Sequence, residues 1–220
     1  MPTRTRAGIP AAPSKARDPL PRVAFHPATP ARWNDVALLF GERGACAGCW
    51  CMFWRLPRAR FEAGKGAGNR RALKALVGSG ARPGVIAYAD GEPVGWCAVA
   101  PRANYVSLAN SRVLKPVDEQ PVWSISCLFV RRDFRRRGLS SLLIDAAAEF
   151  AARRGARIVE GYPVEASAKT ADAFVWTGLA SSFTQAGFRE VSRRSPTRPI
   201  MRRAVRAPRG PRRKPGRDQP

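Results

Sequence analysis

The sequence predicts an α/β (α+β) domain, in which a mixed β-sheet is covered by helices. Apolar, β-rich runs alternate with segments whose apolar residues recur at three- and four-residue spacing, as in amphipathic helices. Asp90-Gly91-Glu92 separates two of the apolar runs, which is a strong signal for a β-hairpin. With 220 residues, of which 45% are hydrophobic, the chain is long enough for one domain with a sizeable core.

Proline and charge divide the chain into a domain and two tails. Residues 1–30 and 192–220 hold 13 of the 20 prolines. We therefore predict a disordered, basic and Pro-rich tail at 1–22, a folded domain at 23–204 and a disordered tail rich in Pro and Arg at 205–220. The tails do not account for the whole net charge of +23, because residues 23–191 contain 23 basic and 14 acidic side chains.

The first half of the domain is predicted to run strand, helix, helix, strand, strand. Val-Ala-Phe-His is a short extended run, and the segment after it has a Pro near its start and a Gly at its end, as helices often do. A Gly-rich linker precedes the second, basic helix. The predicted elements cover residues 23–26, 30–41, 69–77, 84–89 and 93–100.

The second half begins with a buried central strand at 121–130, whose residues are β-branched and aromatic with almost no charge. A helix follows, with Leu and Ala recurring on one face from Leu139 to Phe150, and Arg153-Arg154-Gly155 ends it as the helix dipole and a left-handed cap favour. The remaining predicted elements are a strand at 156–163, a helix at 171–186 and strands at 187–192 and 199–204.

Five arginines lie within seven positions after the central strand, which indicates a polyanionic ligand, either a nucleic acid or a nucleotide cofactor. Arg135-Arg136-Arg137-Gly138-Leu139-Ser140 connects that strand to the helix. Free N–H groups at a helix N-terminus bind pyrophosphate, and Gly138 allows close approach. The alternative is a basic helix cap on a solvated surface. Arginines at the start of a helix oppose its dipole, however, which favours an anionic ligand.

This segment resembles motif A of the GNAT acetyltransferase superfamily, Arg/Gln-x-x-Gly-x-Gly/Ala after a strand. Arg135 and Gly138 match the signature, and Ser140 replaces the usual Gly or Ala. The resemblance extends over 23–204 through the order of the elements. It implies a mostly antiparallel sheet of six to seven strands, with helices on both faces and splayed fourth and fifth strands. It also implies acetyl-CoA as co-substrate, bound by Leu128, Phe129, Val130, Arg135, Arg136, Arg137, Gly138, Leu139 and Ser140.

The resemblance further implies direct transfer of an acetyl group to an amine-bearing acceptor, which is a small molecule or a peptide or protein amine. Many members of the superfamily use a Tyr in the last helix to protonate the leaving thiolate, and Phe183 stands there in this chain. Glu160 and Tyr162 are the nearest candidate catalytic groups, with Glu165 close by. A structural role, in which Glu160 pairs with a core arginine and Tyr162 is an aromatic wall, explains them equally well.

Cys46-Ala-Gly-Cys49-Trp50-Cys51 could ligate a metal, but no nearby Cys or His supplies a fourth ligand, so no metal is predicted. The resemblance implies that the region between the first two helices overlies the acceptor site, so Trp50, Phe53 and Trp54 are predicted to line it, with core filling under a long loop as the alternative. Cys127 lies on the central strand, where a cysteine is more often a small hydrophobic residue than a nucleophile.

Two other functions compete with the enzyme. One is a non-catalytic acyl-CoA sensor of the same fold, and the other is a basic protein that binds nucleic acid, with nonspecific contacts through the C-terminal tail. No apolar run approaches the length of a membrane helix, and the odd number of cysteines argues against a secreted disulfide framework. We therefore expect a cytoplasmic protein with reduced thiols and no membrane contact, either a monomer or a homodimer.

Overall fold

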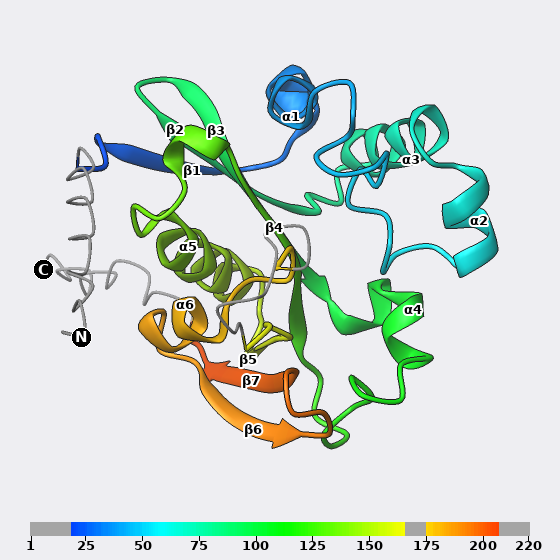
Figure 1. The fold of residues 1–220 in the computed structure, drawn as a ribbon, viewed down its shortest axis with the longest axis vertical. Helices are drawn as coiled ribbons and strands as arrows, with labels where there is room; N and C mark the ends of the chain where they lie inside the picture. Colours follow the sequence, from blue (N-terminus) through cyan, green and yellow to red (C-terminus); the bar gives the residue numbers. More distant parts are fainter. Residues whose placement is uncertain (1–18, 166–174, 207–220) are drawn as a thin grey trace, which may run out of the picture.

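The computed structural model describes residues 19–165 and 175–206, which contain one seven-stranded sheet in the order β1-β2-β3-β4-β5-β7-β6 (Figure 1). Every neighbouring pair is antiparallel except β4 and β5, which are parallel. The predicted mixed, mostly antiparallel sheet is confirmed. The strands are β1 (Val23–Pro27), β2 (Gly84–Ala89), β3 (Glu92–Pro101), β4 (Trp123–Val130), β5 (Ile158–Gly161), β6 (Arg189–Arg193) and β7 (Pro199–Ala204).

Helices cover both faces of the sheet (Figure 1). The helix α5 packs on one face with α6, while α1 and α3 pack on the other. The α-helices are α1 (Trp33–Phe40), α2 (Arg58–Ala63), α3 (Ala67–Gly78), α4 (Val106–Ala109), α5 (Leu139–Arg153) and α6 (Ala180–Gln185). Three 3-10 helices, η1 (Pro30–Arg32), η2 (Arg102–Asn104) and η3 (Arg132–Phe134), complete them. No helix in the described ranges has the length and apolar character needed to cross a membrane.

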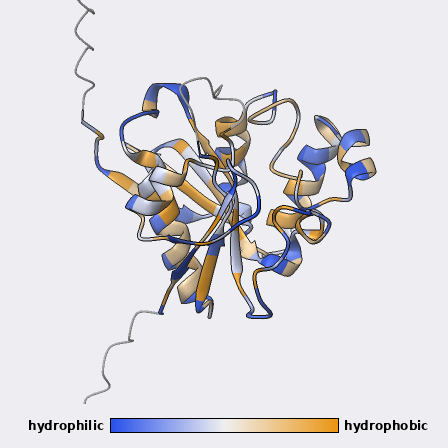
Figure 2. Ribbon diagram, turned by 60° about the horizontal axis from the view of Figure 1, so that its bottom comes forward, coloured by the Kyte–Doolittle hydropathy of each residue, from blue (hydrophilic) through white to orange (hydrophobic). Residues whose placement is uncertain are grey.

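Side-chain alternation along β2 separates the two main hydrophobic cores. Val85 and Ala87 belong to the core under α5, and Ile86 and Tyr88 belong to the core under α1 and α3. Successive residues of a strand point to opposite faces, so one nearly uninterrupted apolar run supplies both cores. Figure 2 shows the hydrophobic residues along the central strands.

The hairpin predicted between β2 and β3 is confirmed. Asp90 and Gly91 have φ values of 50° and 84°, so both central residues of the turn are left-handed. This backbone suits a two-residue hairpin turn, because its twist matches that of the flanking strands.

The strands β4 and β5 separate part of the way along β4. Their pairing covers only Trp123–Ile125 and Val159–Gly161, whereas β4 continues to Val130. The register of β4 on β3 shifts where Ala98 pairs with Cys127 and Val99 with Ile125, so β4 has one extra residue at this point. The splayed fourth and fifth strands are therefore present.

The predicted helix at 171–186 is wrong for residues 175–179, and its first four residues lie outside the described ranges. The helix α6 begins only at Ala180. Before it, Gly178 has a φ of 89°, and the N–H of Leu128 on β4 donates to the Trp176 carbonyl at 2.7 Å. The Gly178 N–H also donates to the Val175 carbonyl at 2.8 Å, so a turn held against β4 stands where the helix was predicted. The helices α2 and α4 were not predicted, because four to six residues are too few for a periodic pattern.

Parts of both predicted tails belong to the domain. Leu20 packs against the core under α5, and so does Val205, whose N–H donates to the Arg157 carbonyl at 2.9 Å. The rest of the two predicted tails, 1–18 and 207–220, lies outside the described residues.

Candidate functional site

A cavity of about 430 Å³ opens where β4 leaves β5 and α5 begins. Ala45 and Cys46 line it from the segment after α1, and residues 175–179 contribute a third wall through Val175, Trp176, Gly178 and Leu179. We call this space the donor cavity. The predicted cofactor residues that line it are Leu128, Phe129, Val130, Arg135, Arg136 and Ser140.

The N-terminus of α5 forms one end of the donor cavity. Gly138 caps the helix with a φ of 82°, and Arg136 is also left-handed with a φ of 58°. The backbone N–H groups of residues 136–141 have no acceptor among the described carbonyls. These N–H groups, together with the positive end of a fifteen-residue helix dipole, form a site for an anion such as a phosphate.

The three arginines of this loop point in different directions. Arg135 donates from Nε to the Val130 carbonyl at 3.0 Å, which fixes the loop against the end of β4. Arg136 is exposed and lines the cavity. Arg137 points away, because its Nη2 donates to the Pro19 carbonyl at 2.5 Å. Leu139 is 1% exposed and packs in the core, so Arg137 and Leu139 can offer the cavity only backbone groups.

The hydrogen-bonding groups of β4 face its two edges alternately. Arg131 N–H donates to the Val94 carbonyl on the β3 side, which places the Phe129 backbone on that side too. Leu128 and Val130 therefore face the open edge. Residues 128–130 were all predicted to bind the cofactor through their backbone. The backbone groups of Phe129 instead face β3, although Phe129 lines the cavity. The Leu128 N–H faces the open edge but already donates to the Trp176 carbonyl.

Three aromatic rings form a cluster beside this edge. The ring centroids of Phe53 and Trp54 are 4.8 Å apart, and Trp176 lies 5.3 Å from Phe53 and 5.9 Å from Trp54. The indole N–H of Trp54 is buried without a hydrogen-bond partner among the described residues. The sequence did not point to Trp176, because its segment was predicted to be helical. Gly178, two residues later, was the available signal for a break.

Trp50 does not join this cluster. It is 2% exposed, and its ring lies 6.2 Å from Trp33 and 5.6 Å from Phe40 of α1. Of the two alternatives for Trp50, this position favours core filling. Phe53 and Trp54 are partly buried, and both contact Trp176, which lines the donor cavity.

Glu160 and Tyr162 lie together in a buried polar network. Glu160 Oε1 accepts from Arg102 Nη1 at 3.0 Å and from the Tyr162 hydroxyl at 2.6 Å, and its Oε2 accepts from Arg202 Nε at 2.7 Å. Both Glu160 and Tyr162 are fully buried. Burial, followed by the negative charge of Glu160, raises the pKa of Tyr162. This geometry favours the structural alternative for Glu160, because both of its oxygens are occupied.

A second cavity, of about 650 Å³, lies beside this network. Arg102, Tyr105, Glu160 and Arg202 line it together with apolar residues of α4 and of the loop before β4. The Tyr105 hydroxyl accepts from Arg55 Nη2 at 3.1 Å, and burial raises the pKa of Tyr105 to about 12. Glu165 lies apart from the network, in an exposed ion pair with Arg193.

Phe183 is fully buried, and its ring packs 5.1 Å from that of Phe188. Where the resemblance leads us to expect a Tyr, this side chain offers no proton. Within the described residues, Tyr105 and Tyr162 are the two fully buried phenols, and both of their hydroxyls are hydrogen-bonded.

The cysteines of the Cys46–Cys51 segment differ in exposure. Cys46 is exposed, Cys49 is half-buried with its pKa raised to about 11 chiefly by burial, and the Cys51 thiol accepts from Trp96 Nε1 at 3.2 Å. The pKa of Cys127 is raised by its hydrogen bond to Cys51 and by burial, which disfavours a nucleophilic thiolate. No group of three His, Cys, Asp or Glu side chains with metal-binding geometry occurs in the described ranges.

The chain is similar to known acetyltransferases. The model of the acetyltransferase (GNAT) family matches residues 50–174, which is more than half of the chain. The chain belongs to the GNAT acetyltransferase family. The match includes β4, the arginine loop and α5, and it ends immediately before the segment that contains Trp176.

Individual relatives are distant. An uncharacterized N-acetyltransferase of Methanocaldococcus jannaschii is 37% identical over 75 residues, which are 34% of this chain and 29% of that protein. A GNAT family acetyltransferase of Listeria monocytogenes has a TM-score of 0.52 at 10% identity, covering 83% of this chain and 95% of its own. The polyamine N-acetyltransferase of Drosophila melanogaster has a TM-score of 0.50 at 9% identity, covering 84% and 100%. These two structures establish the GNAT fold for this chain.

Proposed function

We propose that this GNAT protein is an acetyl-CoA-dependent N-acetyltransferase that transfers the acetyl group directly to an amine. The observation that carries the proposal is the row of N–H groups at residues 136–141, which have no acceptor among the described carbonyls and lie at the end of a cavity that Arg136 and Ser140 line beside the open edge of β4. A pyrophosphate at this helix end would satisfy them. Arg135 and Arg136 add positive charge at the same end.

The open edge of β4 would hold the pantetheine arm. Leu128 and Val130 present their backbone groups there, so the arm would bind as an added strand. Acetyl-CoA supplies an activated thioester. In the transfer, the amine nitrogen forms a bond to the thioester carbon, the carbon–sulfur bond breaks, and the CoA thiol and the acetylated amine leave after the amine has lost a proton.

We assign the acceptor to the side of β4 where the aromatic cluster of Phe53, Trp54 and Trp176 lies. A ring cluster favours a cationic or apolar acceptor, and the unpaired indole N–H of Trp54 would donate to an acceptor oxygen. Tyr162 stays a candidate for a role in proton transfer, whereas Glu160 is assigned to holding Arg102 and Arg202.

The test is titration calorimetry with acetyl-CoA, CoA and ATP on the wild type and on Gly138→Glu. Gly138 has nothing within 4 Å of an added Cβ, and the new carboxylate would repel the phosphates. Gly155→Glu is the matched control, because Gly155 ends the same helix with a positive φ of 91° and the same open space. Both variants carry a comparable backbone penalty and the same added charge, so only the position of the new carboxylate differs.

We expect acetyl-CoA and CoA to bind the wild type and Gly155→Glu, and to bind Gly138→Glu at least about a hundredfold more weakly, as the loss of two or more charge-assisted hydrogen bonds implies. Equal affinity for both variants, or no binding of acetyl-CoA to the wild type, would refute the proposal.

A non-catalytic acyl-CoA sensor is the second candidate, and the buried Phe183 favours it because the usual proton donor is absent. Release of the CoA thiol in the presence of a panel of small amines and peptides separates the two functions. Turnover with any amine supports the enzyme, and tight acetyl-CoA binding without turnover supports the sensor.

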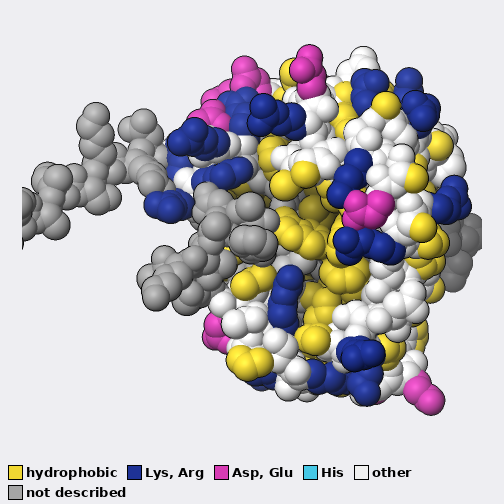
Figure 3. Space-filling view, turned by 45° about the vertical axis from the view of Figure 1, so that its right-hand side comes forward, with side chains coloured by type: hydrophobic (Ala, Val, Ile, Leu, Met, Phe, Trp, Pro, Cys, Tyr) yellow, Lys and Arg dark blue, Asp and Glu magenta, His cyan; other side chains and the backbone are white. Residues whose placement is uncertain are grey.

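The net positive charge of the chain would favour nonspecific contact with nucleic acid. Figure 3 shows Lys and Arg side chains around a hollow lined by hydrophobic groups on one face. The C-terminal tail that was predicted to make such contacts lies mainly outside the described residues. This contact, like the cytoplasmic location, stays a prediction.

A further inference from the structure

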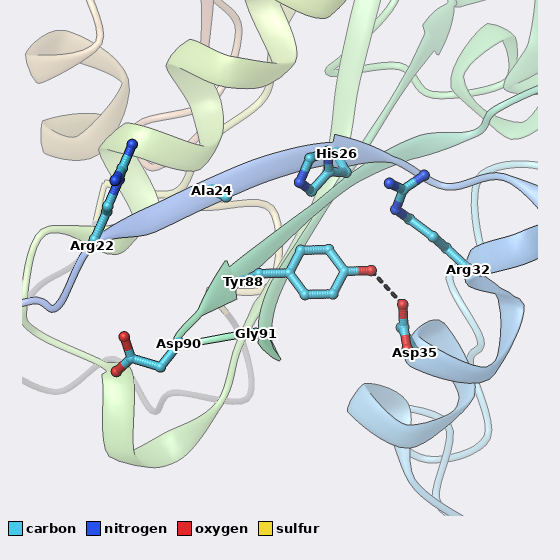
Figure 4. A pocket seen from close by; sticks show the side chains of 8 residues that line it. All are labelled: Arg22, Ala24, His26, Arg32, Asp35, Tyr88, Asp90 and Gly91. Carbon is cyan, nitrogen blue, oxygen red and sulfur yellow. Dashed lines mark hydrogen bonds between the residues drawn. The ribbon is translucent and has the colours of Figure 1, made fainter.

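A third cavity, of about 420 Å³, lies at the other edge of the sheet. It is built by β1, by the β2–β3 hairpin and by the start of α1, and it shares no residue with the donor cavity or with the cavity beside Glu160. We call it the β1 cavity. Its lining is Arg22, Ala24, His26, Arg32, Asp35, Tyr88, Asp90 and Gly91 (Figure 4).

The β1 cavity holds charges of both signs that do not pair with each other. Arg22 and Arg32 are cationic, and Asp35 and Asp90 are anionic, yet none of the four forms an ion pair with a described residue. Elsewhere in the chain, arginines near carboxylates do pair, as Arg202 does with Asp118 at 2.6 Å. Arg32 and Asp35 are also partly buried, and their hydrogen bonds are to neutral hydroxyls, from Arg32 to Thr29 Oγ1 at 3.5 Å and from Tyr88 to Asp35, so a ligand of opposite charge could compensate each of them.

The charges form two mixed pairs at opposite ends of Tyr88. In Figure 4, Arg32 and Asp35 lie at the hydroxyl end of the Tyr88 side chain, and Arg22 and Asp90 lie at its other end. The Tyr88 hydroxyl donates to Asp35 Oδ2 at 2.6 Å, which fixes the position of that carboxylate and joins β2 to α1. Asp35 Oδ1 has no hydrogen-bond donor among the described residues.

Aromatic and small residues form the rest of the cavity. The rings of His26 and Tyr88 meet edge to face with centroids 5.5 Å apart, and they give an aromatic corner in which an apolar group can pack. Ala24 and Gly91 leave space beside them because they lack bulky side chains.

From these observations we propose that the β1 cavity binds a small zwitterion of the amino-acid class, separately from acetyl transfer. Its carboxylate lies beside Arg32, its ammonium group lies beside Asp35, and its side chain packs on the rings of Tyr88 and His26. A ligand with both charges compensates both of these side chains, which a ligand with one charge cannot do.

The test is titration calorimetry without acetyl-CoA, with L-phenylalanine as the probe. N-acetyl-L-phenylalanine retains the carboxylate without the ammonium group, and L-phenylalaninamide retains the ammonium group without the carboxylate. The variants are Asp35→Asn, which keeps an oxygen for the Tyr88 hydroxyl, and Arg32→Gln. Arg153→Gln, on the exposed end of α5, is the control for loss of one cation.

We expect L-phenylalanine to bind the wild type and Arg153→Gln about tenfold or more tightly than either single-charge analogue, and to bind both cavity variants about tenfold more weakly. Acetyl-CoA should bind Asp35→Asn and Arg32→Gln as it binds the wild type, which shows that both variants fold. Absence of L-phenylalanine binding, equal binding of a single-charge analogue, or full binding by the cavity variants would each overturn the proposal. None of these results depends on whether the protein transfers acetyl groups.

Discussion

At the scale of single residues, the Glu160 carboxylate is fully buried and accepts hydrogen bonds from the side chains of Arg102, Tyr162 and Arg202. Removing a charge from water is costly, and these three donors offset that cost. The network joins β5 to β7 through Arg202 and to the end of β3 through Arg102. Its loss should therefore affect folding more than chemistry.

Glu160→Gln should lower the free energy of unfolding by about 3–5 kcal/mol, because the amide replaces one acceptor oxygen with a donor and leaves two arginines without full compensation. Urea denaturation followed by circular dichroism measures the change. Glu149→Gln removes an exposed carboxylate that pairs with Arg153 on α5, and it should change the free energy of unfolding by less than about 1 kcal/mol. An unchanged free energy of unfolding for Glu160→Gln, together with lost acetyl transfer, would instead assign Glu160 to catalysis.

At the scale of elements, the contact between β5 and α6 depends on a missing side chain. A Cβ at Gly161 would lie 2.0 Å from Cε1 of the buried Phe183 ring. Gly161 is also the last β5 residue paired with β4. The Phe183 ring of α6 thus packs against the sheet at the point where β4 and β5 separate.

Gly161→Ala should destabilise the protein by about 1–3 kcal/mol or more, because the fully buried ring has little room to move. Gly68→Ala is the comparison, since Gly68 lies inside α3 with nothing within 4 Å of an added Cβ. That change should stabilise the protein by about 0.5–1 kcal/mol through the higher helix propensity of Ala. Thermal unfolding of both variants measures the difference, and destabilisation of similar size in both would contradict the steric argument.

The sequence was informative where an element depends on its own residues. The apolar run at 121–130 predicted β4, and Asp90-Gly91 predicted the hairpin, because burial on both faces and left-handed turn residues leave local patterns. The arginine loop was placed correctly at the start of α5 for the same reason. The resemblance to the GNAT family added the separation of β4 from β5, which no single segment encodes.

What the sequence could not supply depends on distant contacts. Residues 175–179 form a turn instead of a helix because their carbonyls accept from the N–H groups of Leu128 on β4 and of Val164, and these donors lie far away in the chain. For the same reason, Arg102 and Arg202 were not linked to Glu160, and the contact of Trp176 with Phe53 was not foreseen. The charges around the β1 cavity come from three elements and have no common motif.

At the scale of the whole molecule, the three tyrosines make stability depend on alkaline pH. Burial is the largest cause that raises the pKa of Tyr88, Tyr105 and Tyr162, with Tyr105 at about 12 against an ordinary 10.0. A raised pKa favours the protonated folded state, so this stabilisation is complete below the unfolded value near 10.0 and is lost as the pH rises through the folded value. Cys49, with a pKa of about 11, acts in the same direction.

Between about pH 10 and 12, each of the fully buried Tyr105 and Tyr162 should reduce the free energy of unfolding by about 1.4 kcal/mol per pH unit, and the more exposed Tyr88 should contribute less. Ultraviolet absorbance should show tyrosinate forming together with the loss of near-ultraviolet circular dichroism. Ionisation of all three tyrosines near pH 10, in a protein whose near-ultraviolet signal is intact, would show that they are accessible to solvent.

The bond between Leu128 and Trp176 has a consequence for ligand binding. An amide hydrogen donates well to one carbonyl at a time, and the Leu128 N–H already donates at 2.7 Å. A pantetheine arm that uses this N–H must first displace the Trp176 carbonyl. Under the proposed function, the Trp176 carbonyl would compete with acetyl-CoA for this N–H at a high effective concentration, because it is covalently attached. The apparent affinity for acetyl-CoA would then be the intrinsic affinity multiplied by the fraction of molecules in which the segment has already withdrawn.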